Sequence, residues 1–184
     1  MASIVEREVK LPVADPAAAR AALASIGAVA VRARRLQDDY LLDSSDRQLQ
    51  GRGSVLRVRL DADRSFLTFK GPVQPSAMKL REELETLVGD GALVLRILGA
   101  LGFHVSYRYQ KYREEFTLGD VIIALDETPI GIYLEIEGSE QGIEATTRAL
   151  GRSEADYVLE SYRGLHLRYC AAHGLPRTDM LFTH

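Results

Sequence analysis

The sequence predicts an α+β fold in which an antiparallel sheet of about eight strands closes into a barrel with flanking helices. Three observations predict it. Most apolar segments alternate with charged residues at a period of two, which is typical of strands. Short turns join successive segments, so the strands pair mainly as antiparallel hairpins, and helical segments lie between and after them. Closure into a barrel removes the two unpaired edges that an open sheet of this size would leave.

Length and composition favour one globular domain. We expect a single domain over residues 1–184, with the barrel over about 3–138 and C-terminal helices over about 139–175. The chain is 46% hydrophobic and 27% charged, and its net charge of −3 gives no basic surface for nucleic acid or anionic membranes. The only cysteine, Cys170, excludes an internal disulfide framework. We expect no leader or membrane span, and a cytoplasmic location.

The first half of the chain should contain most of the sheet. The expected elements are strands that end near Leu11 and that cover 29–42, 55–60, 65–70 and 78–88, with helices over 16–26 and 90–100. The first helix follows Asp15, a good N-cap, and Pro16 suits its first position, while Gly27 ends it. Residues 43–53 are polar and contain glycine and serine, so we expect a loop there.

The second half should complete the sheet and end in helices. The expected elements are strands over 103–116, 121–125 and 130–137, followed by helices over 139–150 and 157–173. Turns are expected at Gly119-Asp120 and at Thr128-Pro129. The segment Tyr157 to Cys170 is also a candidate face for a homodimer, although packing on the barrel is the simpler account.

Full charges occupy one face of strand after strand. Glu6, Glu8 and Lys10 alternate in the first strand, and Arg57 and Arg59 alternate in VLRVRL. For any single strand, the solvated face of an amphipathic sheet explains such charges. It does not explain why some strands offer pairs of bases and others pairs of acids. A barrel with its charged face inward would need an occupant that neutralises both signs.

A metal-bound polyphosphate would satisfy both sets of charges. Its anionic oxygens suit the Lys and Arg side chains, and Arg at alternating positions favours fork-like contacts with successive phosphates. Divalent cations suit the carboxylates. Because the acids are not accompanied by clustered Cys or His, Mg²⁺ or Mn²⁺ is favoured over zinc.

The order of these motifs resembles the CYTH domain family, also called the triphosphate tunnel metalloenzymes. Glu6-Arg7-Glu8-Val9-Lys10 matches the ExExK signature, and LRVR, LTFKG, REELE, KYR and LDETPIGIYLEIEG follow in the family's order as far as about Gly138. The resemblance implies an eight-stranded antiparallel barrel around a tunnel, a triphosphate substrate and a divalent metal. The family's activities include hydrolysis of inorganic or organic triphosphates and cyclisation of ATP by class IV adenylate cyclases.

The same resemblance implies a role for each matched charge. The implied metal ligands are Glu6, Glu8, Asp126, Glu135 and Glu137. The implied triphosphate ligands are Lys10, Arg57, Arg59, Lys70, Arg81, Lys111 and Arg113. Glu83 and Asp126 are the candidate catalytic residues, and alternation with Arg81 turns Glu83 inward, where it would order a metal or an attacking water. Tyr40 matches a recurring aspartate-tyrosine feature of the second strand in the family, for which a structural role is an equally good explanation.

Hydrolysis of a triphosphate is the favoured activity. No adenine-reading group of residues is visible, and the His-Phe pair that precedes ExExK in some class IV cyclases is absent from MASIVEREVK. Adenylate cyclisation, which yields cyclic AMP and pyrophosphate, remains an alternative. A non-catalytic module that binds polyphosphate or nucleotide is a second alternative, against which the complete set of acids argues.

Overall fold

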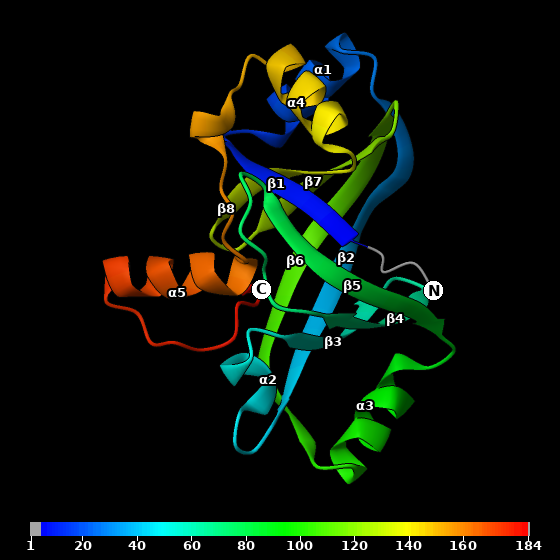
Figure 1. The fold of residues 1–184 in the computed structure, drawn as a ribbon, viewed down its shortest axis with the longest axis vertical. Helices are drawn as coiled ribbons and strands as arrows, with labels where there is room; N and C mark the ends of the chain where they lie inside the picture. The colour runs from blue at the N-terminus through cyan, green and yellow to red at the C-terminus, as the bar shows by residue number, and fades with distance from the viewer. Residues whose placement is uncertain (1–4, 184) are drawn as a thin grey trace.

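The computed structural model describes residues 5–183, and its eight strands form a closed antiparallel barrel, as predicted (Figure 1). The strands follow one another around the barrel in the order β1-β5-β4-β3-β2-β6-β7-β8. Their bounds are β1 Val5–Val13, β2 Val29–Ser44, β3 Val55–Asp61, β4 Arg64–Lys70, β5 Lys79–Val88, β6 Phe103–Leu118, β7 Val121–Thr128 and β8 Gly131–Glu137. The predicted start of the barrel at residue 3 lies outside the described residues.

Helices cover the two ends and one side of the barrel. Their bounds are α1 Pro16–Ser25, α2 Gln48–Gly51, α3 Gly91–Ala100, α4 Glu140–Ala149, a 3₁₀ turn Glu154–Asp156 and α5 Tyr162–His173. In Figure 1, α1 and α4 lie together at one end, α3 lies at the other and α5 lies at the side. Asp15 caps α1 as predicted, since its carboxylate accepts the N–H of Ala18 at 2.6 Å. In the described part of the chain, no helix is long and apolar enough to cross a membrane.

Two local predictions were wrong. The polar segment 43–53 is not all loop, because the carboxylate of Asp43 accepts the N–H groups of Leu49 and Gln50 at 3.0 and 2.9 Å and so fixes the short helix α2. The last helix was expected from Tyr157, yet α5 begins five residues later, at Tyr162.

The late start of α5 has a tertiary cause. The backbone of Val158 forms a two-way bridge with Lys10 of β1, with N···O distances of 3.2 and 2.9 Å. Extended pairing with a strand is incompatible with helix, so this contact overrides the local helical preference of the segment.

The hydrophobic core lies outside the barrel. Val9 of β1 and Ile136 of β8 pack against Leu23 of α1 and Ile143 of α4, and all four side chains are fully buried. Because side chains alternate along a strand, the neighbours of Val9, Glu8 and Lys10, point inward. The apolar contacts that stabilise the fold therefore leave the interior to charged residues.

A second apolar cluster seals the side of the barrel. β7 pairs only with residues 112–118 of β6, which leaves the first half of β6 without a strand on that edge. The C-terminal segment covers it, with Met180 bonding through its backbone to Arg108 and Gln110 at 3.0 and 2.9 Å. Tyr162 and Leu165 of α5 pack into the same cluster. α5 therefore brings side chains from the end of the chain to the barrel interior.

Candidate active site

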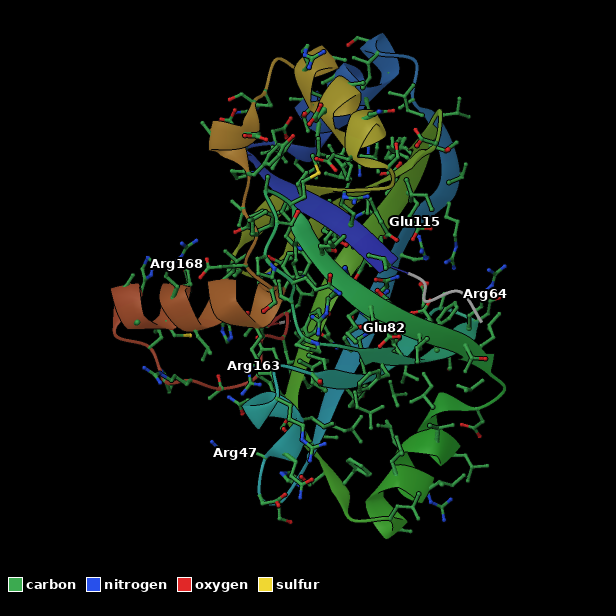
Figure 2. All side chains as sticks on the ribbon, in the orientation of Figure 1. Arg47, Arg64, Glu82, Glu115, Arg163 and Arg168 are labelled. Atoms are coloured by element: carbon green, nitrogen blue, oxygen red, sulfur yellow. The ribbon has the colours of Figure 1, made fainter. Side chains whose placement is uncertain are left out.

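The barrel interior holds two cavities that share part of their lining but differ in charge. Their volumes are about 280 and 380 Å³, and Arg57, Arg59, Lys70 and Glu135 line both. We call the smaller cavity the basic mouth, because its lining also includes Lys10, Lys79, Arg81, Lys111 and Arg163. We call the larger cavity the acidic mouth, because its lining also includes Glu6, Glu83, Glu85, Glu115 and Glu137. In Figure 2, Arg163 lies beside the start of α5 and Glu115 lies on the upper part of β6.

The residues of β1 join the two sets of charges. Glu8 lies opposite Lys79 of β5 in the sheet and makes ion pairs with it and with Lys10, the second at 2.8 Å. Lys10 also lies 3.0 Å from Glu135 of β8. Burial and Glu135 raise the pKa of Glu8, but the charges of Lys10 and Lys79 outweigh them and hold it well below its ordinary value. Glu8 is therefore an ionised carboxylate in a basic surrounding.

Arg57 and Arg59 share one buried acid. The carboxylate of Asp39 on β2 lies 2.8 Å from Nε of Arg59 and 3.5 Å from Nε of Arg57. Arg57 also lies 3.2 Å from Glu85. Nε of Arg57 and one oxygen of Asp39 are buried without a hydrogen-bond partner among the described residues. Asp39 therefore orients both guanidinium groups, and both arginines line the two cavities.

Lys111 and Arg113 share a second buried acid. Asp126 of β7 accepts from Lys111 Nζ at 2.9 Å and from Arg113 at 2.7 and 2.6 Å. Arg113 also contacts Glu135 at 2.8 Å. Burial and the charge of Arg113 lower the pKa of Lys111 to about 8. An anion in the cavity would favour its protonated form.

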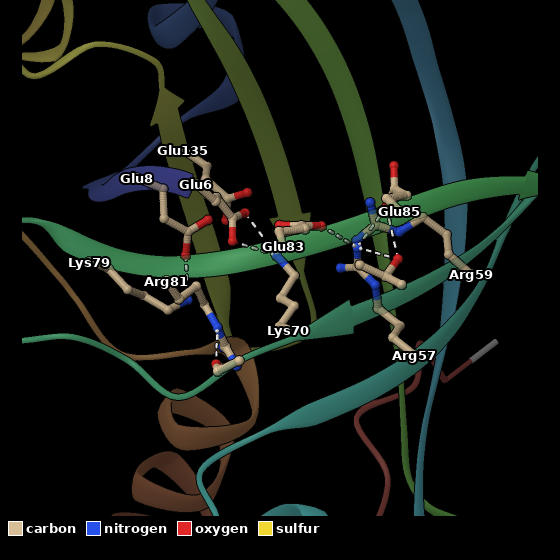
Figure 3. Close-up of polar contacts among 12 residues, drawn as sticks. Glu6, Glu8, Arg57, Arg59, Lys70, Lys79, Arg81, Glu83, Glu85 and Glu135 are labelled. Atoms are coloured by element: carbon tan, nitrogen blue, oxygen red, sulfur yellow. Dashed lines mark hydrogen bonds and ion pairs between the residues drawn. The ribbon is translucent and has the colours of Figure 1, made fainter. Parts of the chain in front are cut away.

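The acidic mouth carries more carboxylates than nearby bases. Nζ of Lys70 lies 2.8 Å from Glu6 and 2.6 Å from Glu83. Figure 3 shows the Lys70 side chain pointing towards these two carboxylates. Burial and the charge of Glu8 nevertheless raise the pKa of Glu6 to about 8. Glu137 is exposed as a whole residue, yet desolvation of its carboxyl and the charge of Glu135 raise its pKa to about 7. These two carboxyls therefore resist ionisation until further positive charge is supplied.

The predicted metal ligands fit a hard divalent cation by their chemistry. Glu6, Glu8, Glu135 and Glu137 offer only carboxylate oxygens, which Mg²⁺ and Mn²⁺ prefer. The raised pKa values of Glu6 and Glu137 mark the place where a cation would relieve repulsion between acids. Among the described residues, no three acid, His or Cys side chains are already arranged around a metal position. A bound cation would therefore compete with the lysines that now hold Glu6 and Glu8.

Arg81 lies in the wall of the basic mouth but turns to the backbone. Its guanidinium donates to the carbonyl of Gly71 at 2.8 and 2.5 Å, and only 5% of the residue is exposed. Burial lowers the pKa of Arg81 relative to its ordinary value. The contact fixes the connector after β4. Because two nitrogens of the Arg81 guanidinium already bond to Gly71, fewer N–H donors are available to a phosphate than on Arg57 or Arg59.

Two predicted residues lie apart from the cavity surface. Asp126 lines neither cavity, because its oxygens are covered by Lys111, Arg113 and the hydroxyl of Tyr162. Its role as a metal ligand or catalytic residue stays a prediction. Tyr40 lies on the outer face of β2, where Arg108 lies over its ring at 5.0 Å and its hydroxyl is 3.4 Å from Asp38.

Several residues that line or support the site were not predicted from the sequence, among them Lys79, Asp39 and Tyr162, as well as Arg163 and Glu115. Lys79 had a usable signal, since it alternates with Arg81 and Glu83 on one face of β5. Asp39 had only a weak one, because it shares the inward face of β2 with a second acid, Asp43. Tyr162 had none, because it is adjacent to the interior only through the packing of α5. The charges predicted to face inward are otherwise brought together in one interior.

Comparison with known proteins identifies the family of this chain. The CYTH domain model matches residues 5–162 of this chain. A "putative adenylate cyclase" of Methanocaldococcus jannaschii is 27% identical over 148 residues, which cover 80% of this chain and 84% of that protein.

Solved structures share the fold. A "putative adenylate cyclase" from Vibrio parahaemolyticus has a TM-score of 0.78 at 21% identity, with 90% of this chain and 99% of that chain covered. A "putative adenylyl cyclase" from Hippeastrum, stated to have a dominant triphosphatase activity, has a TM-score of 0.65 at 15% identity, with 94% and 96% covered. At these identities the likeness concerns the architecture alone.

Proposed function

Because this chain belongs to the CYTH domain family, we propose that it is a metal-dependent phosphohydrolase acting on inorganic, organic or nucleoside triphosphates. The observation that carries the proposal is the interior itself. The first cavity is lined by Lys10, Arg57, Arg59, Lys70 and Lys111 from four different strands, and the acidic mouth adds carboxylates. A triphosphate with a divalent cation supplies the opposite charge to both sets.

The basic residues bind and orient the phosphate chain. Arg57 and Arg59 offer guanidinium groups from adjacent inward positions of β3, and Lys70 projects beside them from β4 (Figure 3). Donors fixed in this way stabilise the negative charge that develops on phosphate oxygens during transfer. Their ion pairs with Asp39 and Glu83 hold them in place before substrate arrives.

Glu83 is the candidate for ordering the attacking water. Burial raises its pKa, but a hydrogen bond from Glu6 and the charges of Lys70 and Arg57 lower it overall. Glu83 is therefore the ionised member of the Glu6–Glu83 pair, and an ionised carboxylate accepts a proton from water. Water attack on a terminal phosphorus then breaks the bond to the bridging oxygen. Mg²⁺ or Mn²⁺, held by Glu6, Glu8, Glu135 and Glu137, would neutralise charge on the phosphate oxygens.

Adenylate cyclisation is the second candidate, favoured by the name of the Methanocaldococcus relative. The phosphate site would be the same, and the ribose 3′-hydroxyl of ATP would replace water as nucleophile. The two activities give different products. Purified protein is therefore incubated with tripolyphosphate, ATP and thiamine triphosphate, each with Mg²⁺ or Mn²⁺ and with a chelator control.

The products decide between the activities. Metal-dependent release of phosphate supports hydrolysis, whereas cyclic AMP and pyrophosphate from ATP support cyclisation and overturn the hydrolase assignment. Tight binding of all three compounds without turnover supports a binding module. Neither binding nor turnover with any of them contradicts the triphosphate proposal as a whole.

A further inference from the structure

Tyr162 links the C-terminal helix to the interior of the barrel. It is the first residue of α5, and its hydroxyl donates to Oδ2 of Asp126 on β7 at 2.6 Å. Tyr162 is 5% exposed and Asp126 is 0% exposed. A buried hydroxyl needs a partner, and this one bonds to a carboxylate that orients two of the predicted phosphate ligands.

The carboxylate of Asp126 is fully used. Besides Tyr162, it accepts from Lys111 Nζ, Arg113 Nε and a terminal nitrogen of Arg113 at 2.9, 2.7 and 2.6 Å. An ionised carboxylate offers about four acceptor positions. The hydroxyl of Tyr162 therefore supplies the one neutral donor of the four, and it comes from outside the barrel strands.

The ring of Tyr162 lies near two lysines of the basic mouth, Lys10 and Lys111. Nζ of Lys10 lies 5.2 Å and Nζ of Lys111 lies 4.9 Å from its centroid. These are cation–π distances, so the ring attracts the two ammonium groups at the wall of the basic mouth. Tyr133 meets the ring edge-on at 5.7 Å, which fixes its plane.

We propose that Tyr162 is a positioning residue of the triphosphate site, acting through Asp126 on Lys111 and Arg113. The expected effect on triphosphate binding rests on the proposed function. When phosphate oxygens draw Lys111 and Arg113 towards the cavity, the hydroxyl of Tyr162 keeps Asp126 oriented behind them. The end of the chain thus takes part in setting affinity for substrate, although no part of it belongs to the motifs of β1 to β8.

The test compares Tyr162→Phe with Tyr107→Phe. Both variants delete one hydroxyl from the same apolar cluster between α5 and the barrel, and the hydroxyl of Tyr107 bonds to His166 at 2.9 Å rather than to a charged residue of the cavity. We expect kcat/KM for the triphosphate to fall about ten- to hundredfold in Tyr162→Phe, which is the loss typical of a hydrogen bond to a charged group. The loss should appear mainly in KM, since Lys111 and Arg113 hold the phosphates in the ground state. Tyr107→Phe should change kcat/KM less than twofold.

Two further measurements separate positioning from a general loss of structure. In a Lys111→Met background, Tyr162→Phe should lower kcat/KM much less than it does in the parent, because Tyr162 and Lys111 act through one network. Modification of Lys111 by an amine-reactive reagent, followed by mass spectrometry, should be faster in Tyr162→Phe than in the parent or in Tyr107→Phe.

Equal losses of kcat/KM in the two Phe variants, additive effects with Lys111→Met, or unchanged labelling of Lys111 would each overturn the inference. If the parent turns over no triphosphate, the proposed function fails. The labelling comparison then still decides whether Tyr162 holds Lys111 in place.

Discussion

Oδ1 of Asp39 lies 2.8 Å from Nε of Arg59, in a pair of which neither residue is more than 9% exposed. Asp126 stands in the same relation to Arg113 on the neighbouring strand of the barrel. Each acid lies behind basic side chains that face the cavity. The interior therefore contains its own counter-charges, and a substrate anion binds to bases that are already oriented.

Replacement of Asp39 should therefore destabilise the protein strongly. Asp39→Asn leaves Arg57 and Arg59 buried without their shared counter-charge, and we expect a loss of about 3–5 kcal/mol in the free energy of unfolding by urea denaturation. Because tripolyphosphate supplies negative charge to the same arginines, it should restore part of the loss.

Asp38→Asn is the matched control. Asp38 is the adjacent residue on β2, and it pairs with Arg108 in a more exposed position. Its replacement should lower the free energy of unfolding by at most about 1 kcal/mol, and tripolyphosphate should not restore this loss. Equal costs for the two variants would contradict the proposed role of Asp39.

Glu8 should be essential for turnover. Glu8→Gln keeps the size of the side chain but removes a carboxylate that is a predicted metal ligand and that pairs with Lys10 and Lys79. We expect metal-dependent turnover to fall at least about a hundredfold at saturating metal, with weaker Mn²⁺ binding by titration calorimetry. The exposed Glu140, which lies 3.8 Å from Arg7, provides the control Glu140→Gln, with unchanged turnover. An unaffected rate in Glu8→Gln would refute the metal-site assignment.

Tyr40 should be dispensable for catalysis. Its ring lies on the outside of β2 against Arg108, and its hydroxyl makes only a long contact of 3.4 Å with Asp38. Tyr40→Phe should therefore leave kcat and KM within about twofold of the parent values and change stability by less than about 0.5 kcal/mol. A selective loss of kcat in steady-state assays would place Tyr40 in the catalytic machinery after all.

His166 should make stability fall in mild acid. Burial lowers its pKa below the ordinary value, against a smaller opposing effect of Asp179, and its ring nitrogens contact Tyr107 and Cys170 at 2.9 and 3.3 Å. A base whose folded pKa is lowered binds fewer protons in the folded than in the unfolded state. Stability from the neutral ring is therefore present above the ordinary pKa of about 6.5 and is lost as the pH falls below it.

The measurement is the melting temperature between about pH 8 and about pH 5.5. The melting temperature of the parent should fall more on acidification than that of His166→Gln, in which the titrating group is absent. Parallel curves for the two proteins would show that His166 does not contribute.

The strands and their charged faces were predictable because both are local properties. Alternation in Glu6-Arg7-Glu8-Val9-Lys10 and in VLRVRL fixes which residues share a face, and closure of the barrel follows from the number of strands that need partners. The start of α5 was not predictable, because the bridge between Val158 and Lys10 joins residues far apart in the chain.

The sequence by itself determined the barrel, its family and most of the inward charges, Lys79 and Asp39 excepted, since these depend on period, spacing and motif order. Only the tertiary structure decided which charges neutralise one another. Asp39 pairs with Arg57 and Arg59, and Asp126 pairs with Lys111 and Arg113. The nearby positive charge does not prevent the pKa values of Glu6 and Glu137 from being raised. Ion pairing depends on distances across the closed barrel, and register around eight strands and the docking of α5 set those distances.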